Sequence, residues 1–539
     1  MRKHWLMALA FVAFVAFASF ASAQTYTVLY NFGSHAGDPE NPGGVIAQGP
    51  DGDLYGTSIP FGSGSPVDVF KFTPSGTLMV IHEFAAPNGF SIGGVTLGTD
   101  GRFYGVVING GIGPDGAVFK LTMGGNLTTL HSFTGGADGR TPLVPPIEGI
   151  DGNFYGTAAA GGAGVCSQGC GTVYEVPSSG AERTLHMFNG ADGASPHAPL
   201  VQGTDGNFYG TTYSGGYKGN GTIFRISPSG SFLSLFNFHG ANGSNPVGLI
   251  QGSDGAFYGT TVNGGAFNAG VVFKLANGSF TVLHSFTGGS GGIGPEGGLV
   301  EATDGNLYGT TAAGTCGDNT IFRITPTGEF ATLYIFPSDA SMGCEPLATL
   351  LQRTDGLLYG TTAGGGSLNE GVFFSFDIGA GPFVTFLPAA RQVGHTVEIL
   401  GQGLTGATGV SFGGTPATTF TVLTDTFMTA TVPDGATTGF IKVITPSGTF
   451  TSNKQFQVKP QITGVSPMSG PIGTSVVITG VSLTQTSKIT FNNVVATNFT
   501  VNSDAQVTVI VPAGATTAKV GVTTTGAPVY SATNFTVTQ

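Results

Sequence analysis

Seven aspartates recur through the chain at intervals of 49 to 54 residues, and such an array of carboxylates could do chemistry. Carboxylates bind calcium and cleave glycosides, but Asp-Gly is also a favoured sequence for a tight hairpin turn. Each aspartate opens the phrase Asp-Gly-x-Phe/Leu-Tyr-Gly-Thr, and only one copy replaces its threonine, with Val106. Seven near-identical copies predict a structural role for the phrase, and they are Asp51, Asp100, Asp151, Asp205, Asp254, Asp304 and Asp355.

Acids outside the phrase offer two further possibilities. The G-A-D/N-G loops could contribute to calcium sites through Asp138, Asp192 and Asn242, although they lack clustered oxygen ligands. Non-repeated acids in long loops could form the carboxylate pair of a glycoside hydrolase, with Asp115, Asp318 and Glu370 as candidates. No spacing in the sequence singles out a pair, so we predict no catalytic residue, no metal site and no cofactor.

Other ionisable side chains also keep to fixed repeat positions. One position before x-Phe holds histidine in some copies and Tyr or Phe in others, which predicts packing rather than metal ligation; it is occupied by His82, His131, His186, His284, Tyr30, Phe236 and Tyr334. Another strand position holds mostly cations and is explained by a partly solvated strand face; its members are Lys71, Lys120, Arg225, Lys274, Arg323, Glu175 and Ser375.

The four cysteines are the best-placed candidates for covalent chemistry. Cys166 and Cys170 lie in one long loop, while Cys316 and Cys344 lie in successive long loops. An even count in an exported protein predicts disulfides, and the economical pairings are 166–170 and 316–344. The rival is a four-cysteine metal site, which would have to join pairs three repeats apart.

The elements that position these residues follow from the period of about 50 residues, which is typical of a β-propeller. In the fourth repeat we predict strands at residues 200–203, 207–212, 222–227 and 232–238, and we expect Gly210 to admit a neighbouring sheet. The seventh repeat has no obvious fourth strand, whereas residues 26–32 have that pattern. We therefore predict an all-β fold with a seven-bladed propeller at residues 24–382, closed by its N-terminal strand.

A second internal repeat follows, with a constant offset of 79 residues. Its two copies, 383–459 and 460–539, are rich in short Val/Thr strands, which predicts two immunoglobulin-like β-sandwiches. The strings IGTSVVITGVSL and VGHTVEILGQGL resemble the IPT/TIG family of immunoglobulin-like domains. The resemblance implies spacers or interaction modules on secreted surface proteins and no catalysis.

The first two-thirds of the chain resembles the GloVer tandem-repeat family of bacterial secreted proteins. Strings such as GLVEATDGNLYGTT and GVVFKLANGSFTVLHSFTGG carry this resemblance over about residues 24–380. That family commonly carries varied C-terminal anchors. Here no hydrophobic tail or sorting signal follows the second sandwich, so we expect release or non-covalent association with the cell surface.

The composition and the N-terminal segment limit the cellular location of the protein and the classes of partner that it can bind. Arg2 and Lys3 precede an apolar stretch that ends at Ala21-Ser22-Ala23, so residues 1–23 are a predicted signal peptide, and no membrane span is expected after its cleavage. The net charge of −12, with only 9% charged residues, argues against nucleic acid and anionic lipid. We expect a secreted or cell-surface monomer whose partner is an extracellular protein or a polysaccharide.

The pattern of the repeats places long, variable loops on one face of the propeller and tight turns on the other. Variable loops on a rigid scaffold favour a non-catalytic interaction or scaffold protein, unless the loops are glycine-rich linkage without a ligand. The alternative is a carbohydrate-active protein, either lectin-like or a glycoside hydrolase or lyase. Cleavage removes Trp5, the only tryptophan, which counts against sugar stacking, although Tyr217 or Phe267 could substitute.

Overall fold

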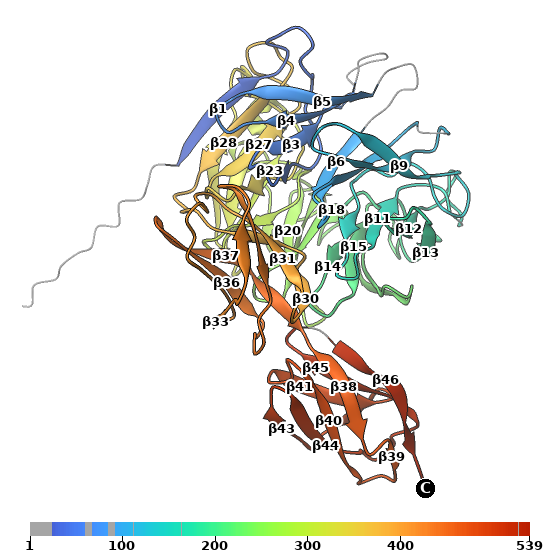
Figure 1. The fold of residues 1–539 in the computed structure, drawn as a ribbon. Coiled ribbons are helices and arrows are strands. Elements are labelled where there is room, and N and C mark those ends of the chain that lie inside the picture. The colour runs from blue at the N-terminus through green and yellow to red at the C-terminus, as the bar shows by residue number, and fades with distance from the viewer. Residues whose placement is uncertain (1–23, 60–66, 85–91, 111–112, 163, 527) are drawn as a thin grey trace, which may run out of the picture.

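The structure is a computed structural model that describes residues 24–59, 67–84, 92–110, 113–162, 164–526 and 528–539 (Figure 1). The predicted signal peptide, residues 1–23, lies outside the described residues. Within that part of the chain the fold is all-β, as the sequence predicts, with two short 3-10 helices as its only helical elements, η1 (Gly289–Gly291) and η2 (Cys316–Asp318).

Residues 25–377 form seven four-stranded sheets, which we number 1 to 7 in chain order. Sheets 1 and 2 contain β2 (Ala47–Gln48), β3 (Leu54–Thr57), β4 (Val67–Phe72), β5 (Leu78–Phe84), β6 (Ile92–Leu97), β7 (Phe103–Val107), β8 (Ala117–Leu121) and β9 (Leu127–Ser132). Sheets 3 and 4 contain β10 (Ile147–Glu148), β11 (Phe154–Ala158), β12 (Thr172–Val176), β13 (Arg183–Met187), β14 (Val201–Gln202), β15 (Phe208–Thr212), β16 (Thr222–Ile226) and β17 (Phe232–Asn237). The four strands predicted for the fourth repeat are thus confirmed, with ends trimmed by one or two residues.

The remaining three sheets repeat this order, except that the last takes its fourth strand from the N-terminus. Sheets 5 and 6 contain β18 (Ser244–Gln251), β19 (Phe257–Asn263), β20 (Val271–Ala276), β21 (Ser279–Ser285), β22 (Val300–Glu301), β23 (Leu307–Thr311), β24 (Thr320–Ile324) and β25 (Phe330–Ile335). Sheet 7 contains β26 (Leu351–Gln352), β27 (Leu358–Thr362), β28 (Val372–Asp377) and β1 (Thr25–Asn31). The strand β1 pairs antiparallel with β28 from Thr25 opposite Asp377 to Asn31 opposite Val372, which is the pairing that the sequence predicts.

The repeated phrase builds both a turn and the contact to the next sheet. In sheet 4 the Asp205 side chain accepts hydrogen bonds from the backbone N–H of Asn207 (3.1 Å) and from the Tyr209 hydroxyl (2.9 Å). All seven motif tyrosines donate in this way to the aspartate four residues earlier, at 2.6 to 2.9 Å. The Tyr209 ring also packs on Phe257 of sheet 5, with ring centroids 4.1 Å apart.

The glycine of the phrase serves a contact within its own sheet, which corrects our expectation for Gly210. A Cβ at Gly210 would lie 2.6 Å from the Phe224 ring and 2.8 Å from Leu200. Gly210 and Phe224 are directly opposed on β15 and β16. The missing side chain therefore makes room for the aromatic ring of the adjacent strand rather than for a neighbouring sheet.

A series of hydrogen bonds joins one sheet to the next near the inner strands. The backbone N–H before each motif aspartate donates to a Gln or Glu side chain on the first strand of the following sheet, as Ile150 does to Gln202 (2.9 Å). The other donor and acceptor pairs are Thr99–Glu148, Thr204–Gln251, Ser253–Glu301, Thr303–Gln352 and Thr354–Gln48. The last pair joins sheet 7 to sheet 1. The joint between sheets 1 and 2 is the exception, since Pro50 has no N–H and Leu97 stands where the acceptor would be.

Residues 383–537 form two modules that follow the same strand order. The first module has two sheets, built from β29 (Thr385–Leu387), β31 (Thr396–Leu400), β35 (Phe427–Thr431) and β34 (Phe420–Val422), and from β30 (Ala390–Gln392), β37 (Gly448–Lys459), β36 (Gly439–Thr445), β32 (Gly409–Phe412) and β33 (Thr415–Pro416). The second module has β38 (Gln461–Ser466), β40 (Ser475–Val481), β44 (Gln506–Ile510) and β43 (Phe499–Ser503), and β39 (Ser469–Gly470), β46 (Pro528–Val537), β45 (Ala518–Thr524), β41 (Thr486–Phe491) and β42 (Val494–Ala496). In Figure 1 the second module projects away from the sheets of the repeats.

Removing β1 tests the closing strand. Deletion of residues 24–33 takes away the partner of β28 together with Phe32, which is fully buried. Burial of one phenylalanine is worth about 3–5 kcal/mol, and an edge strand of sheet 7 would also be exposed. We expect a sharply lower melting temperature than that of the chain starting at Gln24. Coincident melting curves would contradict the role assigned to β1.

The hydrogen bond between Thr354 and Gln48 gives a finer test of the joint between the first and last sheets. In Gln48→Leu the fully buried Thr354 loses the acceptor of its N–H, which should cost about 1–3 kcal/mol, measured by urea unfolding. Leu97→Gln is the matched control, because Pro50 offers that new side chain no donor. Equal stability of Gln48→Leu and the parent would refute the importance of this bond.

Candidate functional site

The sheets present two different ends. The Asp-Gly turns and the turns between third and fourth strands lie at one end, which we call the turn face. The loops after the second and fourth strands lie at the other end, which we call the long-loop face. A ligand site on this scaffold has to use one of these faces or the central space between the inner strands.

The first module covers the turn face. Thr426 donates its hydroxyl to the Pro50 carbonyl (2.7 Å), and Gln402 donates to the Thr354 hydroxyl (3.0 Å). On the opposite side of the module, the Lys459 ammonium donates to the carbonyl of Ile150 (2.9 Å). These contacts reach sheets 1, 3 and 7, so the module occupies much of the face where the motif aspartates lie.

The long-loop face carries exposed apolar side chains at the tips of the loops that link second and third strands. The Val165 side chain is 91% exposed, Tyr217 82%, Phe267 61% and Leu368 50%. They belong to sheets 3, 4, 5 and 7, and Lys218 lies 4.7 Å from the centre of the Tyr217 ring. Large apolar side chains at such exposure are a common feature of binding surfaces when several share one face.

The backbones of three of these loops are held in place although their tips are exposed. The last residue of the adjacent outer strand accepts a hydrogen bond from the loop backbone, as Asn237 does from Tyr217 N–H (3.0 Å). Asn31 does the same for Ser367 (2.8 Å), and Ser285 for Ala266 (3.5 Å). A loop fixed in this way loses little conformational entropy on binding.

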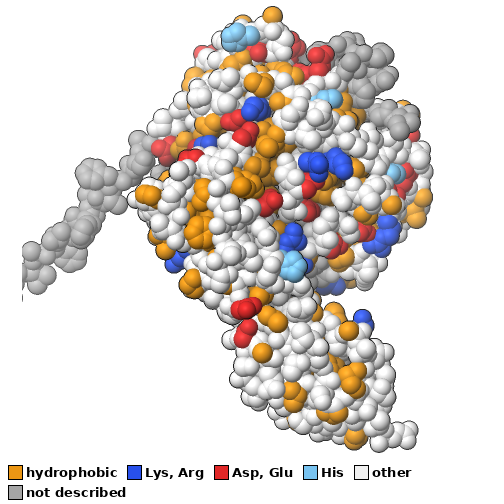
Figure 2. Space-filling model, in the orientation of Figure 1, with side chains coloured by type: hydrophobic (Ala, Val, Ile, Leu, Met, Phe, Trp, Pro, Cys, Tyr) orange, Lys and Arg blue, Asp and Glu red, His pale blue; other side chains and the backbone are white. Residues whose placement is uncertain are grey.

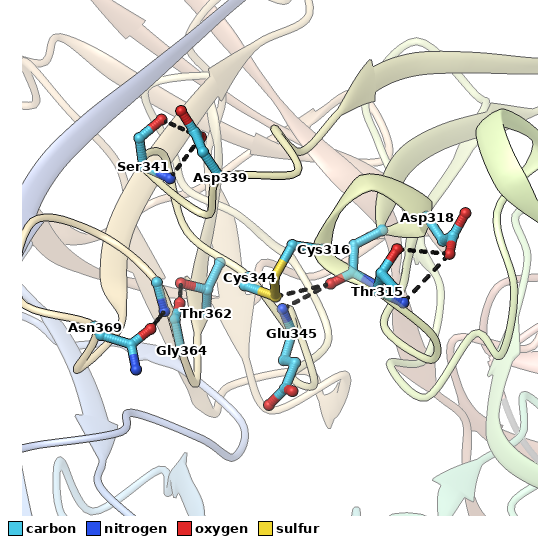
Figure 3. The surroundings of a disulfide bond; sticks show 12 residues. Thr315, Cys316, Asp318, Asp339, Ser341, Cys344, Glu345, Thr362, Gly364 and Asn369 are labelled. Carbon is cyan, nitrogen blue, oxygen red and sulfur yellow. Dashed lines mark hydrogen bonds between the residues drawn. A yellow bond between two sulfur atoms is a disulfide. The ribbon is translucent and has the colours of Figure 1, made fainter.

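Two disulfides strengthen the same face. Cys166 is bonded to Cys170 within the loop of sheet 3, and Cys316 is bonded to Cys344, which joins that loop of sheet 6 to the connection leading to sheet 7. Figure 3 shows the second bond with Thr315 and Asp318 on one side and Asp339 and Ser341 on the other. The Thr315 hydroxyl donates to Asp318 (2.9 Å), and Ser341 donates to Asp339 (2.7 Å), so both flanks are locally ordered.

The acids considered as catalytic candidates lie in three separate loops and have local partners. Asp115 pairs with Arg140 (3.3 Å), Asp318 with Thr315, and Glu370 accepts from the Asn41 amide (3.3 Å). They belong to sheets 2, 6 and 7, and none of these contacts joins one of the three acids to another. Each of the three acids is therefore held by a residue other than the other two acids.

The acids of the G-A-D-G loops serve their own loops. Asp138 accepts from the Thr134 hydroxyl (2.6 Å) and contacts His131 (3.2 Å), and Asp192 accepts from the Asn189 backbone and contacts His186 (3.0 Å). Across the described residues, no three His, Cys, Asp or Glu side chains are grouped so that they could hold a metal ion.

The histidine position is a packing position, as predicted, and it joins consecutive sheets. The His186 ring stacks on Phe232 of the next sheet with centroids 3.8 Å apart, and His284 stacks on Phe330 at 3.6 Å. Burial lowers the pKa of both imidazoles, although Asp192 opposes this for His186. The position thus contributes aromatic contacts between outer strands.

The cation position is more specific than a solvated strand face. Lys71 forms ion pairs with Asp53 (2.8 Å) and Asp51 (3.4 Å), and Lys274 pairs with Asp254 (2.9 Å). Each lysine lies directly opposite a motif tyrosine on the neighbouring strand, Lys71 opposite Tyr55 and Lys274 opposite Tyr258. The sequence contained the necessary signal, namely the recurrence of a cation opposite five of the seven Asp-Gly-x-x-Tyr phrases.

The surface as a whole carries few charges. Figure 2 shows one face of the molecule, on which most atoms are uncharged and acidic and basic side chains occur in small mixed groups. Among the described residues, no helix has the length and apolar character needed to cross a membrane.

The sheets, their joints and the two following modules define a repeat-based propeller protein. The model of the Gloeobacter/Verrucomicrobia repeat matches residues 15–165, 91–319 and 235–421, which together cover more than half of the chain. The chain belongs to this family. The IPT/TIG domain model matches residues 460–537, the second module. The third repeat match also runs past residue 382 into the first module, so the family model includes part of it.

Comparison with other proteins adds distant similarities only. No curated protein matches the chain. A putative 6-phosphogluconolactonase from Bacteroides uniformis is 16% identical over 56% of this chain and 87% of its own, with a TM-score of 0.41. A putative gluconolactonase is 12% identical over 67% and 94%, with a TM-score of 0.38, and a surface glycan-binding protein from Prevotella bryantii is 16% identical over 28% and 41%, with a TM-score of 0.23. Such similarities are too distant to indicate a function here.

The interface between the first module and the turn face contains an unusual carboxyl group. The Glu398 side chain on β31 has a buried oxygen without a hydrogen-bond partner. Burial, together with the negative charges of Glu148 and Asp100, raises the pKa of Glu398 to about 7, although Arg391 opposes the shift. Glu398 could not be predicted as a special residue from the sequence, because no local pattern indicates that the first module docks on the turn face.

Glu398 should make the stability of the protein depend on pH. Its pKa is higher in the folded state than the ordinary value of 4.5, so the folded state binds the extra proton. Stability should therefore fall as the pH rises from about 4.5 to about 7 and then level off. In Glu398→Gln this decline should be smaller, as measured by melting temperature across the range. The exposed Asp434→Asn serves as control and should follow the parent; identical profiles for Glu398→Gln and the parent would contradict the assignment.

Proposed function

We propose that the protein is a non-catalytic extracellular interaction or scaffold protein that presents its long-loop face to a partner. In this proposal residues 24–382 form one closed, seven-bladed propeller, and residues 383–459 and 460–539 are two immunoglobulin-like modules. The joint between Thr354 of sheet 7 and Gln48 of sheet 1 supports a closed ring. The shared strand order of the two modules supports their common fold.

One observation carries the choice of face. The turn face is in contact with the first module, whereas the long-loop face has Tyr217, Phe267 and Leu368 exposed on loops whose backbones are fixed. Aromatic and aliphatic side chains on ordered loops provide contact area at low entropic cost. The partner class in this proposal is an extracellular protein or a polysaccharide.

The location and state of the protein are part of the same proposal. Two disulfides favour an oxidising compartment, in agreement with secretion or display at the cell surface. The second module would act as a spacer or as the attachment point, because it projects away from the sheets of the repeats (Figure 1). We expect a monomer.

The apolar loop tips provide the test. Fluorescently labelled mature protein should bind to cells of the bacterium that encodes it, and replacing Tyr217, Phe267 and Leu368 together by serine should reduce that binding at least roughly tenfold, since each anchor is worth about 1 kcal/mol or more. Leu233→Ser is the matched control, because Leu233 is 46% exposed but lies on the outer strand β17. Equal loss in the control, or no loss in the triple variant, would contradict the proposed face.

A glycan array separates the two partner classes. Binding to defined glycans that disappears in Tyr217→Ala would favour the carbohydrate-binding alternative, because the exposed Tyr217 ring offers a stacking surface. Cell binding without any glycan binding would favour a protein partner.

A further inference from the structure

A cavity of about 490 Å³ lies between the inner strands of the repeats and the first module. Its wall takes residues from the first strands of sheets 1, 2, 5, 6 and 7, which surround a common space. The wall is mainly aliphatic, through residues such as Ala47, Ile250, Val300 and Leu351, and the module adds Phe386 and Leu387. This volume is within the range of small-molecule sites, about 300–1,000 Å³.

Most polar groups of the repeats in this wall are already engaged. Gln48 exchanges hydrogen bonds with Thr354, and the Glu301 carboxylate accepts from the backbone and hydroxyl of Ser253. Gln352 exchanges hydrogen bonds with Thr303, as Gln48 does with Thr354. The inner strands therefore offer a ligand an apolar surface rather than free donors.

The module contributes two polar side chains that are not engaged. Asn453 and Lys454 line the cavity from β37. The Asn453 side-chain oxygen is buried without a hydrogen-bond partner, and within the described part of the chain no ion pair or side-chain hydrogen bond is found for Lys454. The Lys454 side chain remains accessible because it borders the cavity, yet the protein around it lowers its pKa, against the opposing effect of Glu301.

A bulge in β37 directs these two residues at the cavity. Phe440 pairs with Gln455, but Lys442 pairs with Thr451, so β37 contains extra residues between them. The buried Ser452 hydroxyl fixes the bulge, since it accepts from the Ile441 N–H (3.0 Å) and donates to the Lys454 carbonyl (2.7 Å). Bulges commonly redirect side chains next to functional sites.

The second module contains the same bulge with different side chains. Ser531 accepts from the Val520 N–H (2.9 Å) and donates to the Thr533 carbonyl (2.7 Å). At the offset of 79 residues, Ala532 and Thr533 stand where the first module has Asn453 and Lys454, and both are exposed to solvent. The fold of the module thus requires the bulge and its serine, but not the Asn-Lys pair.

Stability does not explain the pair either. A buried amide oxygen without a partner costs free energy, and the protein around Lys454 disfavours its charged form, because it lowers the pKa of the ammonium. A module that only had to cover the turn face would be more stable with an apolar side chain at 453, where the amide oxygen is buried without a partner. Groups kept at such a cost, inside a cavity, are typical of binding sites.

We propose that this cavity binds a small amphipathic carboxylate, with its carboxylate against the Lys454 ammonium and its alkyl chain along the aliphatic wall. Lys454 is the one cation among the residues that line the cavity, and the Glu301 carboxylate in the same wall already accepts hydrogen bonds from Ser253, so the ammonium can pair with a monoanion. The apolar inner strands match a hydrocarbon chain. A second hollow of about 470 Å³, between the module and the turns of sheets 5 and 6, shares Glu301 and Asn453 with the first. The ligand enters there, at the edge of the module. The site is separate from the long-loop face and does not depend on the function proposed for that face.

Titration calorimetry with octanoate as the probe tests this site. The parent protein should bind octanoate saturably, and Lys454→Met should weaken the affinity at least roughly tenfold, because the carboxylate would lose its charge-assisted hydrogen bond to the ammonium. Octanoate should also raise the melting temperature of the parent but not that of Lys454→Met. No saturable binding to the parent, or equal affinity in Lys454→Met, would overturn the proposal.

Two further variants and one uncharged probe serve as controls for octanoate binding. The double variant Asn453→Ala, Lys454→Thr gives the first module the bulge sequence of the second. It should therefore fold and should lose octanoate binding. Lys519→Met removes an exposed lysine of the second module and should bind like the parent. Octanamide, which has no charge, should bind more weakly; affinity equal to that of octanoate would overturn the role of the carboxylate.

Discussion

The structure depends on the hydrogen bonds that join six of the seven pairs of neighbouring sheets. A single four-stranded sheet from these repeats is apolar on both faces and cannot be stable in water without neighbours. The Gln or Glu of one first strand accepts the N–H that precedes the aspartate of the previous repeat, so the joint repeats with the sequence. Gln48 extends the series from the last repeat back to the first. The N-terminal strand completes the same closure at the outer edge by pairing with β28.

The most regular residues of the chain are engaged in structural hydrogen bonds within their own repeat. Both oxygens of each motif aspartate are used, one by the turn backbone and one by the tyrosine hydroxyl. Burial and this hydrogen bond raise the pKa of the tyrosines, to about 12 for Tyr209. The phenol therefore stays a donor at any physiological pH, and the aspartate stays occupied. A carboxylate in this state serves folding, because both of its oxygens accept hydrogen bonds from its own repeat.

Sequence patterns predicted the elements of the fold well because each of them is local or repeated. The four strands of a repeat, the closing strand and both disulfides follow from spacing and from the period of the chain. Contacts between parts distant in sequence were not predictable in this way. The docking of the first module on the turns involves Gln402, Thr426 and Lys459, which obey no pattern shared with their partners. For the same reason Glu398 and Lys454 were not recognised, since their surroundings exist only once the module is in place.

The two C-terminal modules show how a repeated fold acquires different tasks. Their strand orders agree and their bulges are fixed by equivalent serines, Ser452 and Ser531. In the first module this bulge lines the cavity through Asn453 and Lys454, whereas in the second module Ala532 and Thr533 are exposed to solvent. Contacts of the first module with three sheets make it a cover of the turn face rather than a flexible spacer. If both proposals hold, the protein has two separate places for recognition: the loops exposed at one end of the sheets, and the cavity between the inner strands and the first module at the other.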